Sequence, residues 1–414
     1  MSAAGTREAD HPERGADTSG ATRMRAGRKE ARKAHKLDQL GFVGRGRSRY
    51  RPRNDPSLYG GPYPFFQTGD IKAADLYLHR FSQTYNEAGL AQSKLWEPGT
   101  LCITIAANIA ETAILSIPGC FPDSVVGFIV DEKLADVRFI KYYIDTLKLR
   151  MQNVSRGTTQ DNLSLDKLLT FDFVVPGVET QRKIATILSA YDDLIENNTR
   201  RIKILEEMAQ TIYREWFIHF RFPGYEKLKM VDSPLGKIPE GWVVKKLGDV
   251  IELAYGRALK AENRVDGLVV VYGSGGVVGY HNEGLVKGPG VIVGRKGNVG
   301  RVYWSDDDFF PIDTVFYVQT EISLAYAFYN LRSQNFINND AAVPGLNRNQ
   351  AYLLPFLLPN SGVLTQFQDV VSCLFAQINN LRNESANLRR TRDLLLPGLI
   401  SGELDVESIG RRVD

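Results

Sequence analysis

The stretch LDQLGFVGRGR (Leu37–Arg47) lies over LGDVIELAYGR (Leu247–Arg257) without a gap, each residue matching one 210 positions later. The correspondence continues: Pro98-Gly99 matches Pro289-Gly290, Asn108-Ile109-Ala110 matches Asn298-Val299-Gly300, and Phe121-Pro122 matches Phe310-Pro311. Each copy closes with an apolar run and a proline, TFDFVVP (170–176) or LPFLLPN (354–360). Thr180-Gln181 and Thr365-Gln366 then mark expected helix starts. A repeat of this length indicates a duplicated domain, because solenoid units span only about 20–50 residues.

Composition indicates an ordinary globular protein. The 414 residues, 43% apolar and 24% charged, allow two or three domains, and the duplication favours two. There is neither a run of ~18 apolar residues nor an apolar leader, so we expect a cytoplasmic protein with no membrane partner. The cysteines Cys102, Cys120 and Cys373 are scattered without a CxxC pair, which favours reduced core thiols over disulfides or zinc.

Charge is concentrated at the N-terminus. Residues 1–53 hold 14 Lys and Arg against 6 Asp and Glu, whereas the rest of the chain holds 37 against 42. Bulk charge therefore does not establish nucleic-acid binding, which would need basic groups gathered on one face. Residues 1–36 have almost no large apolar side chain and are predicted to be a disordered tail.

Each copy reads as an α+β domain. The strand-like runs are YPFF, LCITIA and VVGFIV in the first copy and LVVVYG, GVIVG and TVFYV in the second. Helical spacing occurs at Val137–Leu149 and Ser323–Asn335. The pattern predicts similar domains with mixed, twisted sheets over residues 37–178 and 235–362.

Two long helices follow the copies. Residues 179–218 contain neither Gly nor Pro and have apolar residues every three to four positions, which predicts a helix roughly 55–60 Å long within a central segment, 179–222. A second helix is predicted at Leu364–Leu396, ending before Pro397-Gly398, within residues 363–404. We expect an antiparallel, coiled-coil-like pair that separates the domains with pseudo-two-fold symmetry. The alternative is that each helix merely covers its own domain.

The sequence offers no catalytic, metal or cofactor site. Pro122-Asp123 with Asp131-Glu132-Lys133 loosely fits a nuclease pattern, but the matching stretch, Phe310–Asp313, lacks the lysine. The glycines at 273, 275 and 276 suggest a phosphate loop, yet β-branched residues follow them, so a turn or bulge is predicted. The five histidines are dispersed, and no motif for amino methylation of a base is present.

The positive signal is an arginine run, GRGRSRYRPRN (Gly44–Asn54). Alternation along an extended segment would place the guanidinium groups on one side, able to contact guanine edges or phosphates. The alternative is a solvated basic tail. The candidate DNA-binding residues are Arg45, Arg47, Arg49, Tyr50, Arg51, Arg53, Gln67 and Thr68 in the first copy, and Arg257, Lys260, Arg264, Lys296, Asn298 and Arg301 in the second. Because the copies differ in these polar residues, they suit an asymmetric two-part target.

Three segments carry a family resemblance: ETQRKIATILSAYDDLIENN (179–198) with LEEMAQTIYREWF (205–217), LGKIPEGWVVKKLGDV (235–250), and LLLPGLISGELDV (394–406). In this combination the chain resembles the specificity subunit of type I restriction–modification systems over about residues 37–404. The resemblance implies two target-recognition domains that read the halves of a split double-stranded DNA site. It also implies helices that set the spacing and dock two methyltransferase subunits, with motor–nuclease subunits joining for cleavage. Such a subunit is non-catalytic and needs no cofactor.

One departure concerns the start of the first copy. The second copy opens with Trp242 five residues before Leu247, whereas Arg32 stands five residues before Leu37. The opening strand and anchor of the first domain are therefore expected to be altered or missing.

Partner docking is predicted at the end of the central helix. Trp216, Phe217 and Phe220 exceed what a two-helix contact needs and suggest a partner surface. Two other classes stay open. One is a self-contained nuclease or methylase, and the other is a coiled-coil adaptor or DNA-binding subunit of a related methylation or phage-defence complex without restriction activity.

Overall fold

The computed structural model describes residues 31–50, 52, 54–155, 162–336 and 345–409. The chain divides into two compact units, one comprising residues up to Ile71 and His79–Lys183, the other Lys72–Leu78 and the chain from Ile184 onward. Each unit holds one copy of the repeat, and the second also holds most of both long helices. Most of the predicted tail, residues 1–30, lies outside the described residues.

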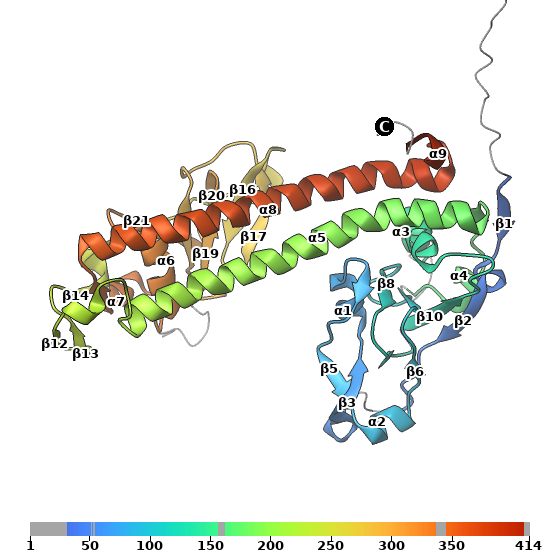
Figure 1. Cartoon of the computed structure of the whole chain (residues 1–414), viewed down its shortest axis with the longest axis horizontal. Coiled ribbons are helices and arrows are strands. Elements are labelled where there is room, and N and C mark those ends of the chain that lie inside the picture. Colours follow the sequence, from blue (N-terminus) through green and yellow to red (C-terminus); the bar gives the residue numbers. More distant parts are fainter. Residues whose placement is uncertain (1–30, 51, 53, 156–161, 337–344, 410–414) are drawn as a thin grey trace, which may run out of the picture. The chain divides into compact units, whose positions relative to one another are not determined.

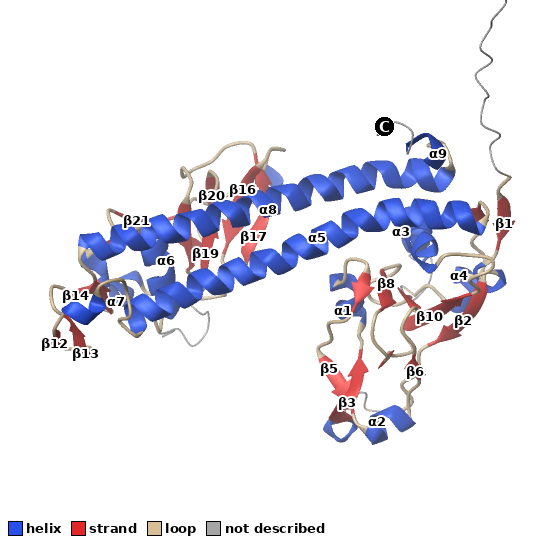
Figure 2. Ribbon diagram, viewed as in Figure 1, coloured by secondary structure: helices blue, strands red, loops and turns tan. Residues whose placement is uncertain are grey.

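The first unit is built on two sheets, with strands red in Figure 2. In one, β2 (Gly41–Arg45), β10 (Val125–Val130), β7 (Leu101–Thr104) and β8 (Thr112–Leu115) lie in this order, all antiparallel, and α3 (Val137–Ser155) packs against β8. The other has the order β5 (Gln83–Tyr85), β3 (Tyr59–Phe65), β9 (Gly119–Cys120) and β6 (Leu95–Trp96) and is mixed, because β3 and β9 are parallel. The short elements of this copy are η1 (Leu37–Gln39), η2 (Pro56–Leu58), α1 (Thr68–Ala73), β4 (Tyr77–Leu78), α2 (Glu87–Ala91) and α4 (Leu165–Leu168).

The second unit repeats this plan. Its antiparallel sheet has the order β15 (Ile251–Tyr255), β21 (Val315–Thr320), β18 (Gly290–Gly294) and β19 (Val302–Ser305). Its mixed sheet has the order β17 (Gly276–His281), β16 (Val269–Gly273) and β20 (Phe309–Pro311). Helix α6 (Leu324–Ser333) takes the place of α3. The smaller elements are η4 (Tyr225–Lys227), β12 (Met230–Ser233), β13 (Gly236–Pro239), η5 (Leu247–Asp249), η6 (Ala261–Asn263), α7 (Arg348–Tyr352) and α9 (Val406–Ile409). The predicted α+β class with mixed sheets is confirmed.

The opening strand is present in both copies. Lys33–His35 form β1, which pairs antiparallel with β11 (Phe173–Val175), just as β14 (Val243–Lys246) pairs with β22 (Pro355–Leu358). The expectation that the first copy lacks this strand is wrong, and so is the assignment of residues 33–36 to the tail. Main-chain pairing with β11 needs no tryptophan at position 32, which explains why the strand forms without one.

Strand pairing also corrects the repeat alignment. Val125 pairs with Thr104, and Val315 pairs with Gly294, so this part of the repeat is offset by 190 residues. Phe121-Pro122 therefore corresponds to Pro311-Ile312, one residue from the predicted match with Phe310-Pro311. The two Phe-Pro dipeptides coincide in sequence but not in register.

Two long helices form an antiparallel pair within the second unit (Figure 1). Helix α5 (Val178–Tyr213) continues into a π-helical turn, η3 (Arg214–Ile218), and α8 covers Ser361–Ser401. Along α5, Asp192 contacts Arg392, Glu206 contacts Arg382 and Tyr213 packs on Phe367, so partner numbers fall as residue numbers rise. The predicted antiparallel pair is confirmed. No helix in the described ranges is both long and apolar enough to cross a bilayer.

Helix α8 does not end before Pro397, contrary to the sequence prediction. It runs through the proline to Ser401 and is capped by Gly402, whose φ is 77°. A proline inside a helix costs about 3 kcal/mol. The last turn buries Leu399 and Ile400, and each such side chain contributes about 1.5–3 kcal/mol when removed from water. Burial of this turn therefore offsets the proline.

The second domain is fixed to the helix pair by an apolar core and by one arginine. Arg382 of α8 contacts Glu206 of α5 at 2.8 Å and Asp306, which follows β19, at 3.3 Å. Trp304 donates its indole N–H to the same Asp306 at 2.8 Å and packs on Phe375 of α8. Arg382 thus links both helices to the sheet of the second domain.

Candidate nucleic-acid interface

A glycine–arginine pair directly follows the first strand of the antiparallel sheet in each copy. A side chain on Gly46 would overlap the carbonyl oxygen of Pro122, and one on Gly256 would overlap that of Ile312. The next amides, of Arg47 and Arg257, donate to the carbonyl oxygens of Phe121 and Pro311, each at 3.0 Å. Glycine is required because the two backbones cross here. Arg47 and Arg257 consequently occupy equivalent positions, and both are exposed.

The arginine run alternates in exposure as its spacing predicts. Arg45, Arg47 and Arg49 are exposed, whereas the intervening Gly46 and Ser48 are buried. Tyr50 is 48% exposed. Arg51 and Arg53 lie outside the described residues. The segment is therefore an ordered edge of the first domain up to Tyr50 rather than a continuation of the tail.

A neighbouring loop supports this edge and adds a further cation. The Gln92 side-chain oxygen accepts from the amides of Arg49 at 2.6 Å and Tyr50 at 3.0 Å. Lys94 places its ammonium 3.6 Å from the centre of the Trp96 ring. Burial and the nearby Arg47 charge lower the pKa of Lys94. Sequence analysis missed Gln92 and Lys94, because nothing in their local pattern points to a segment some 45 residues away.

Gln67 and Thr68 lie at the start of α1. The Gln67 side chain donates to the Gln83 side-chain oxygen at 2.7 Å, and its amide donates to Asp70 at 2.8 Å. Gln67 is exposed, and Thr68 is half-buried. The polar groups of Gln67 thus already serve local structure, which makes Gln67 a weaker candidate than the arginines.

The three cations predicted at the start of the second copy lie in different settings. Arg257 is exposed, and Lys260 is exposed beside Glu262 at 3.6 Å. Arg264 is half-buried and donates to the carbonyl oxygen of Val278 at 2.6 Å. Arg264 therefore supports the β16–β17 hairpin, and its role as a DNA contact stays a prediction.

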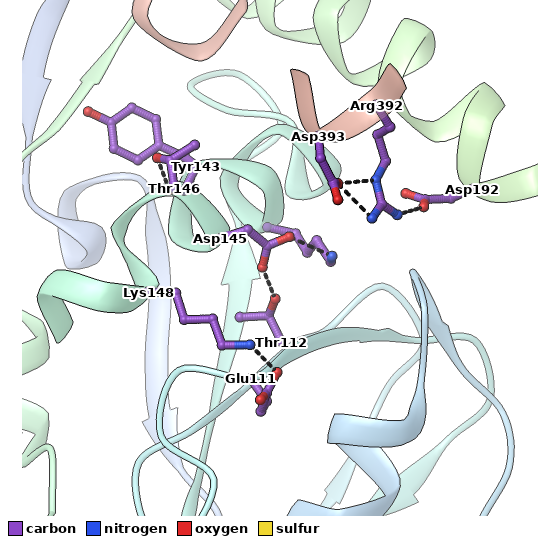
Figure 3. Close-up of polar contacts among 10 residues, drawn as sticks. Glu111, Thr112, Tyr143, Asp145, Thr146, Lys148, Asp192, Arg392 and Asp393 are labelled. Carbon is purple, nitrogen blue, oxygen red and sulfur yellow. Dashed lines mark hydrogen bonds and ion pairs between the residues drawn. The ribbon is translucent and has the colours of Figure 1, made fainter. Parts of the chain in front are cut away.

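The loop between β18 and β19 carries Lys296, Asn298 and Arg301, all exposed. It has the same backbone form as the β7–β8 loop, with positive φ at Gly297 and Gly300 in one and at Ala107 and Ala110 in the other. The first-copy loop has instead Ala106, Asn108 and Glu111 at the three positions. Glu111 contacts Lys148 at 2.7 Å (Figure 3). One backbone framework thus presents basic groups in the second domain and none in the corresponding loop of the first.

A hairpin tip lies beside this basic loop. The glycines of Gly273–Gly276 form the predicted turn, joining β16 to β17. The Tyr303 hydroxyl donates to the carbonyl oxygen of Ser274 at 2.8 Å, which ties the tip to the β19 side of the loop. Ser274 and the basic loop therefore belong to one surface of the second domain.

The docking residues are part of a core. Phe217 is 2% exposed and packs against Trp242, Tyr326 and Phe367. The prediction that Phe217 faces a partner is wrong, because the second domain covers it. Trp216 and Phe220 are half-buried against Phe367 and Trp242, so their docking role stays a prediction.

Comparison with known proteins shows which family and which solved structure this chain is similar to. The model of the type I restriction modification DNA specificity domain matches residues 35–207 and 239–370. The chain is 26% identical over 396 residues to the type I restriction enzyme MjaIX specificity subunit of Methanocaldococcus jannaschii, covering 85% of this chain and 89% of that protein. It is 20% identical over 355 residues to the EcoprrI specificity subunit of Escherichia coli, covering 80% and 84%. In fold it resembles the crystal structure of the type I restriction–modification S subunit from M. genitalium, with a TM-score of 0.58 and 16% identity, covering 91% of this chain and 98% of that one.

Proposed function

The chain belongs to the type I restriction–modification DNA specificity family, and from this premise we propose that its two domains each read one half of a bipartite double-stranded DNA site. As a specificity subunit it is a non-catalytic component of a complex that assembles with DNA. In this proposal the protein binds DNA in the cytoplasm. Two methyltransferase subunits and motor–nuclease subunits join it there.

The observation that carries the proposal is one framework with two different sets of exposed basic groups. The first domain presents them along Arg45–Arg49, beside the half-buried Lys94, and the second presents them at Arg257 and in the Lys296–Arg301 loop. Sequence is read by side chains at base edges, whereas shared phosphate contacts position the protein. Different groups on a common framework therefore favour different half-sites over a palindrome.

Replacing Arg45, Arg47 and Arg49 with Ala tests this assignment. Affinity for the first half-site should fall, because each base-reading pair contributes about 1–3 kcal/mol. Recognition of the second half-site should persist. Binding is measured with the full complex on duplexes in which one half-site at a time is scrambled, and the matched control is Arg389→Ala on α8, an exposed arginine far along the chain from both domains' basic edges. An equal loss for both half-sites, or none, would show that these arginines do not read the first half-site.

For partner docking we propose a surface beside the buried Phe217. Ile218, Met230, Val231 and Leu235 are exposed apolar side chains at the end of α5 and on the β12–β13 hairpin. Exposed apolar groups of this kind commonly mark protein contacts. Met230→Glu with Val231→Glu should weaken capture of the methyltransferase subunits without lowering thermal stability, whereas Val277→Glu on the β17 strand should not. Undiminished assembly of the double variant would refute this location.

The adaptor alternative makes a different prediction. A coiled-coil adaptor without DNA readout would leave the methylation pattern of a host unchanged when the gene is removed. The specificity function predicts that one split sequence motif loses methylation throughout the genome.

A further inference from the structure

Tyr255 ends β15, immediately before the shared Gly256-Arg257 pair, and is 50% exposed. Two guanidinium groups lie over its ring, with Arg295 at 4.9 Å and Arg348 at 4.7 Å from the ring centre. Arg295 follows β18, and Arg348 begins α7. Three segments distant in sequence therefore bring two cations to one exposed aromatic ring.

Each guanidinium is held by the backbone but not neutralised. Arg295 donates to the carbonyl oxygen of Asp313 at 2.9 Å, and Arg348 donates to that of Leu253 at 3.4 Å. Within the described parts of the chain, neither arginine has a carboxylate within 4.0 Å, and the Arg348 Nε atom is buried without a hydrogen-bond partner. A guanidinium carries five N–H donors. Most N–H donors of the two guanidinium groups therefore have no partner among the described residues, and the backbone contacts fix their orientation.

The first domain also holds a guanidinium at the equivalent carbonyl oxygen, but the arginine comes from a different position in the sequence. Arg45, the counterpart of Tyr255, donates its Nε–H to the carbonyl oxygen of Asp123. Asp123 is the counterpart of Asp313 at the 190-residue offset that strand pairing establishes. Equivalent carbonyl oxygens thus tether an arginine in both copies, from unrelated positions in the sequence. Retention of the cation while its source changes points to a ligand that both domains share.

We infer that Tyr255, Arg295 and Arg348 form a subsite for a backbone phosphate of DNA. The inference rests on the proposed DNA-reading function and specifies the part of the ligand bound here. A guanidinium fork matches phosphate oxygens, and stacking on the ring orients the fork while leaving its charge intact. A phosphate is common to every half-site, unlike a base edge, so it suits a point where two differently specific domains agree. Contact here sets the register of the second domain on its half-site.

The test compares the Arg295→Ala, Arg348→Ala double variant with the unaltered full chain, each assembled with the methyltransferase subunits. Affinity is measured across salt concentrations on target duplex and on scrambled duplex. Removing one phosphate contact should reduce the slope of log K against log salt by about 0.9, equivalent to roughly eightfold weaker binding at 0.1 M salt. The loss should be equal for both duplexes, and the methylated motif should not change. Lysines at both positions should restore the salt slope.

Arg332→Ala is the matched control, because Arg332 also lies over an aromatic ring, that of Phe328, but on α6. It should alter neither affinity nor salt slope. A changed base preference in the second half-site would overturn the phosphate assignment in favour of base readout. An unchanged salt slope with a lowered melting temperature would overturn it in favour of a purely structural pair. Failure of the unaltered complex to prefer target over scrambled duplex would instead refute the proposed function itself.

Discussion

In each domain, backbone packing fixes the residue at one position, and the exposed side chains beside it are the proposed DNA contacts. Gly46 and Gly256 are alike because two backbones cross at each, and they fix where Arg47 and Arg257 emerge. The exposed residue before each glycine differs between the copies, with Arg45 in the first and Tyr255 in the second. The glycine keeps the backbone in place, so the exposed side chains next to it can differ between the two domains without disturbing the fold.

The aromatic cluster that joins α5 to the second domain contains tyrosines whose ionisation is suppressed. Burial raises the pKa of Tyr213 and that of Tyr329 to about 12, and their rings stack at 5.4 Å. In an unfolded chain the pKa of tyrosine is about 10. The neutral buried form is therefore favoured by folding below pH 10, and this stability is lost as pH rises from 10 to 12.

We predict that Tyr213→Phe makes unfolding less sensitive to alkali. Urea unfolding between pH 9 and pH 12 should show a slope of free energy against pH that is shallower by up to about 1.4 kcal/mol per pH unit, because one titrating group has been removed. Tyr280→Phe, at an exposed site of the same unit, is the control and should keep the original slope. Identical slopes for all three proteins would show that Tyr213 is not shielded.

At the scale of elements, the helix pair contains a buried ion pair. Asp192 of α5, which is 2% exposed, contacts Arg392 of α8, and Arg392 also contacts Asp393 at 2.9 Å (Figure 3). Burial acts to lower the pKa of Arg392, but the charges and hydrogen bonds of Asp192 and Asp393 raise it on balance. Such a pair specifies which turns of two helices face each other, because any shift leaves a charge buried alone.

Removing one partner should therefore cost much more than removing both. Asp192→Ala is expected to lower the unfolding free energy by about 3–5 kcal/mol, whereas Asp192→Leu with Arg392→Met should be near neutral. Glu207→Ala, which breaks the exposed contact with Lys203 on the same helix, should cost no more than about 0.5 kcal/mol. Chemical denaturation of the four proteins measures this. Equal costs for the single and double variants would show that the pair does not set helix register.

The sequence predicted elements well where local pattern governs them. The helix over 179–218 has no Gly or Pro, and the alternation of Arg45, Arg47 and Arg49 follows the period of an extended chain. Prediction failed where distant contacts decide the outcome. Burial of Leu399 and Ile400 carries α8 past Pro397, and packing under Trp242 turns Phe217 from a surface residue into a core residue.

The candidate site was predictable only in part for the same reason. Closely spaced cations stand out in a sequence, but Lys94 and Arg348 are isolated. Together with Arg295, which adjoins Lys296, they gain meaning when strand pairing brings them beside Trp96 or Tyr255. For Arg264 the structure adds a contact that the sequence does not show, because its guanidinium donates to the Val278 carbonyl oxygen of β17.

At the scale of the whole molecule, we predict that the helix pair sets the distance between the two half-sites in DNA. The Asp192–Arg392 and Glu206–Arg382 contacts place Asn197 of α5 opposite the neighbourhood of Asn387 of α8. Equal insertions at these two points lengthen both helices and keep their facing surfaces in register. Seven residues add about two turns, or roughly 10 Å, which corresponds to about three base pairs at 3.4 Å each.

Methylome sequencing of a host that carries the seven-residue double insertion tests this central claim most directly. The account predicts that both half-sites keep their bases while the unspecified spacer between them gains about three base pairs. A seven-residue insertion in α5 alone, which destroys the register, should abolish methylation and serves as the control. A spacer of unchanged length, with altered bases inside either half-site, would contradict the account and would assign base readout to the helices.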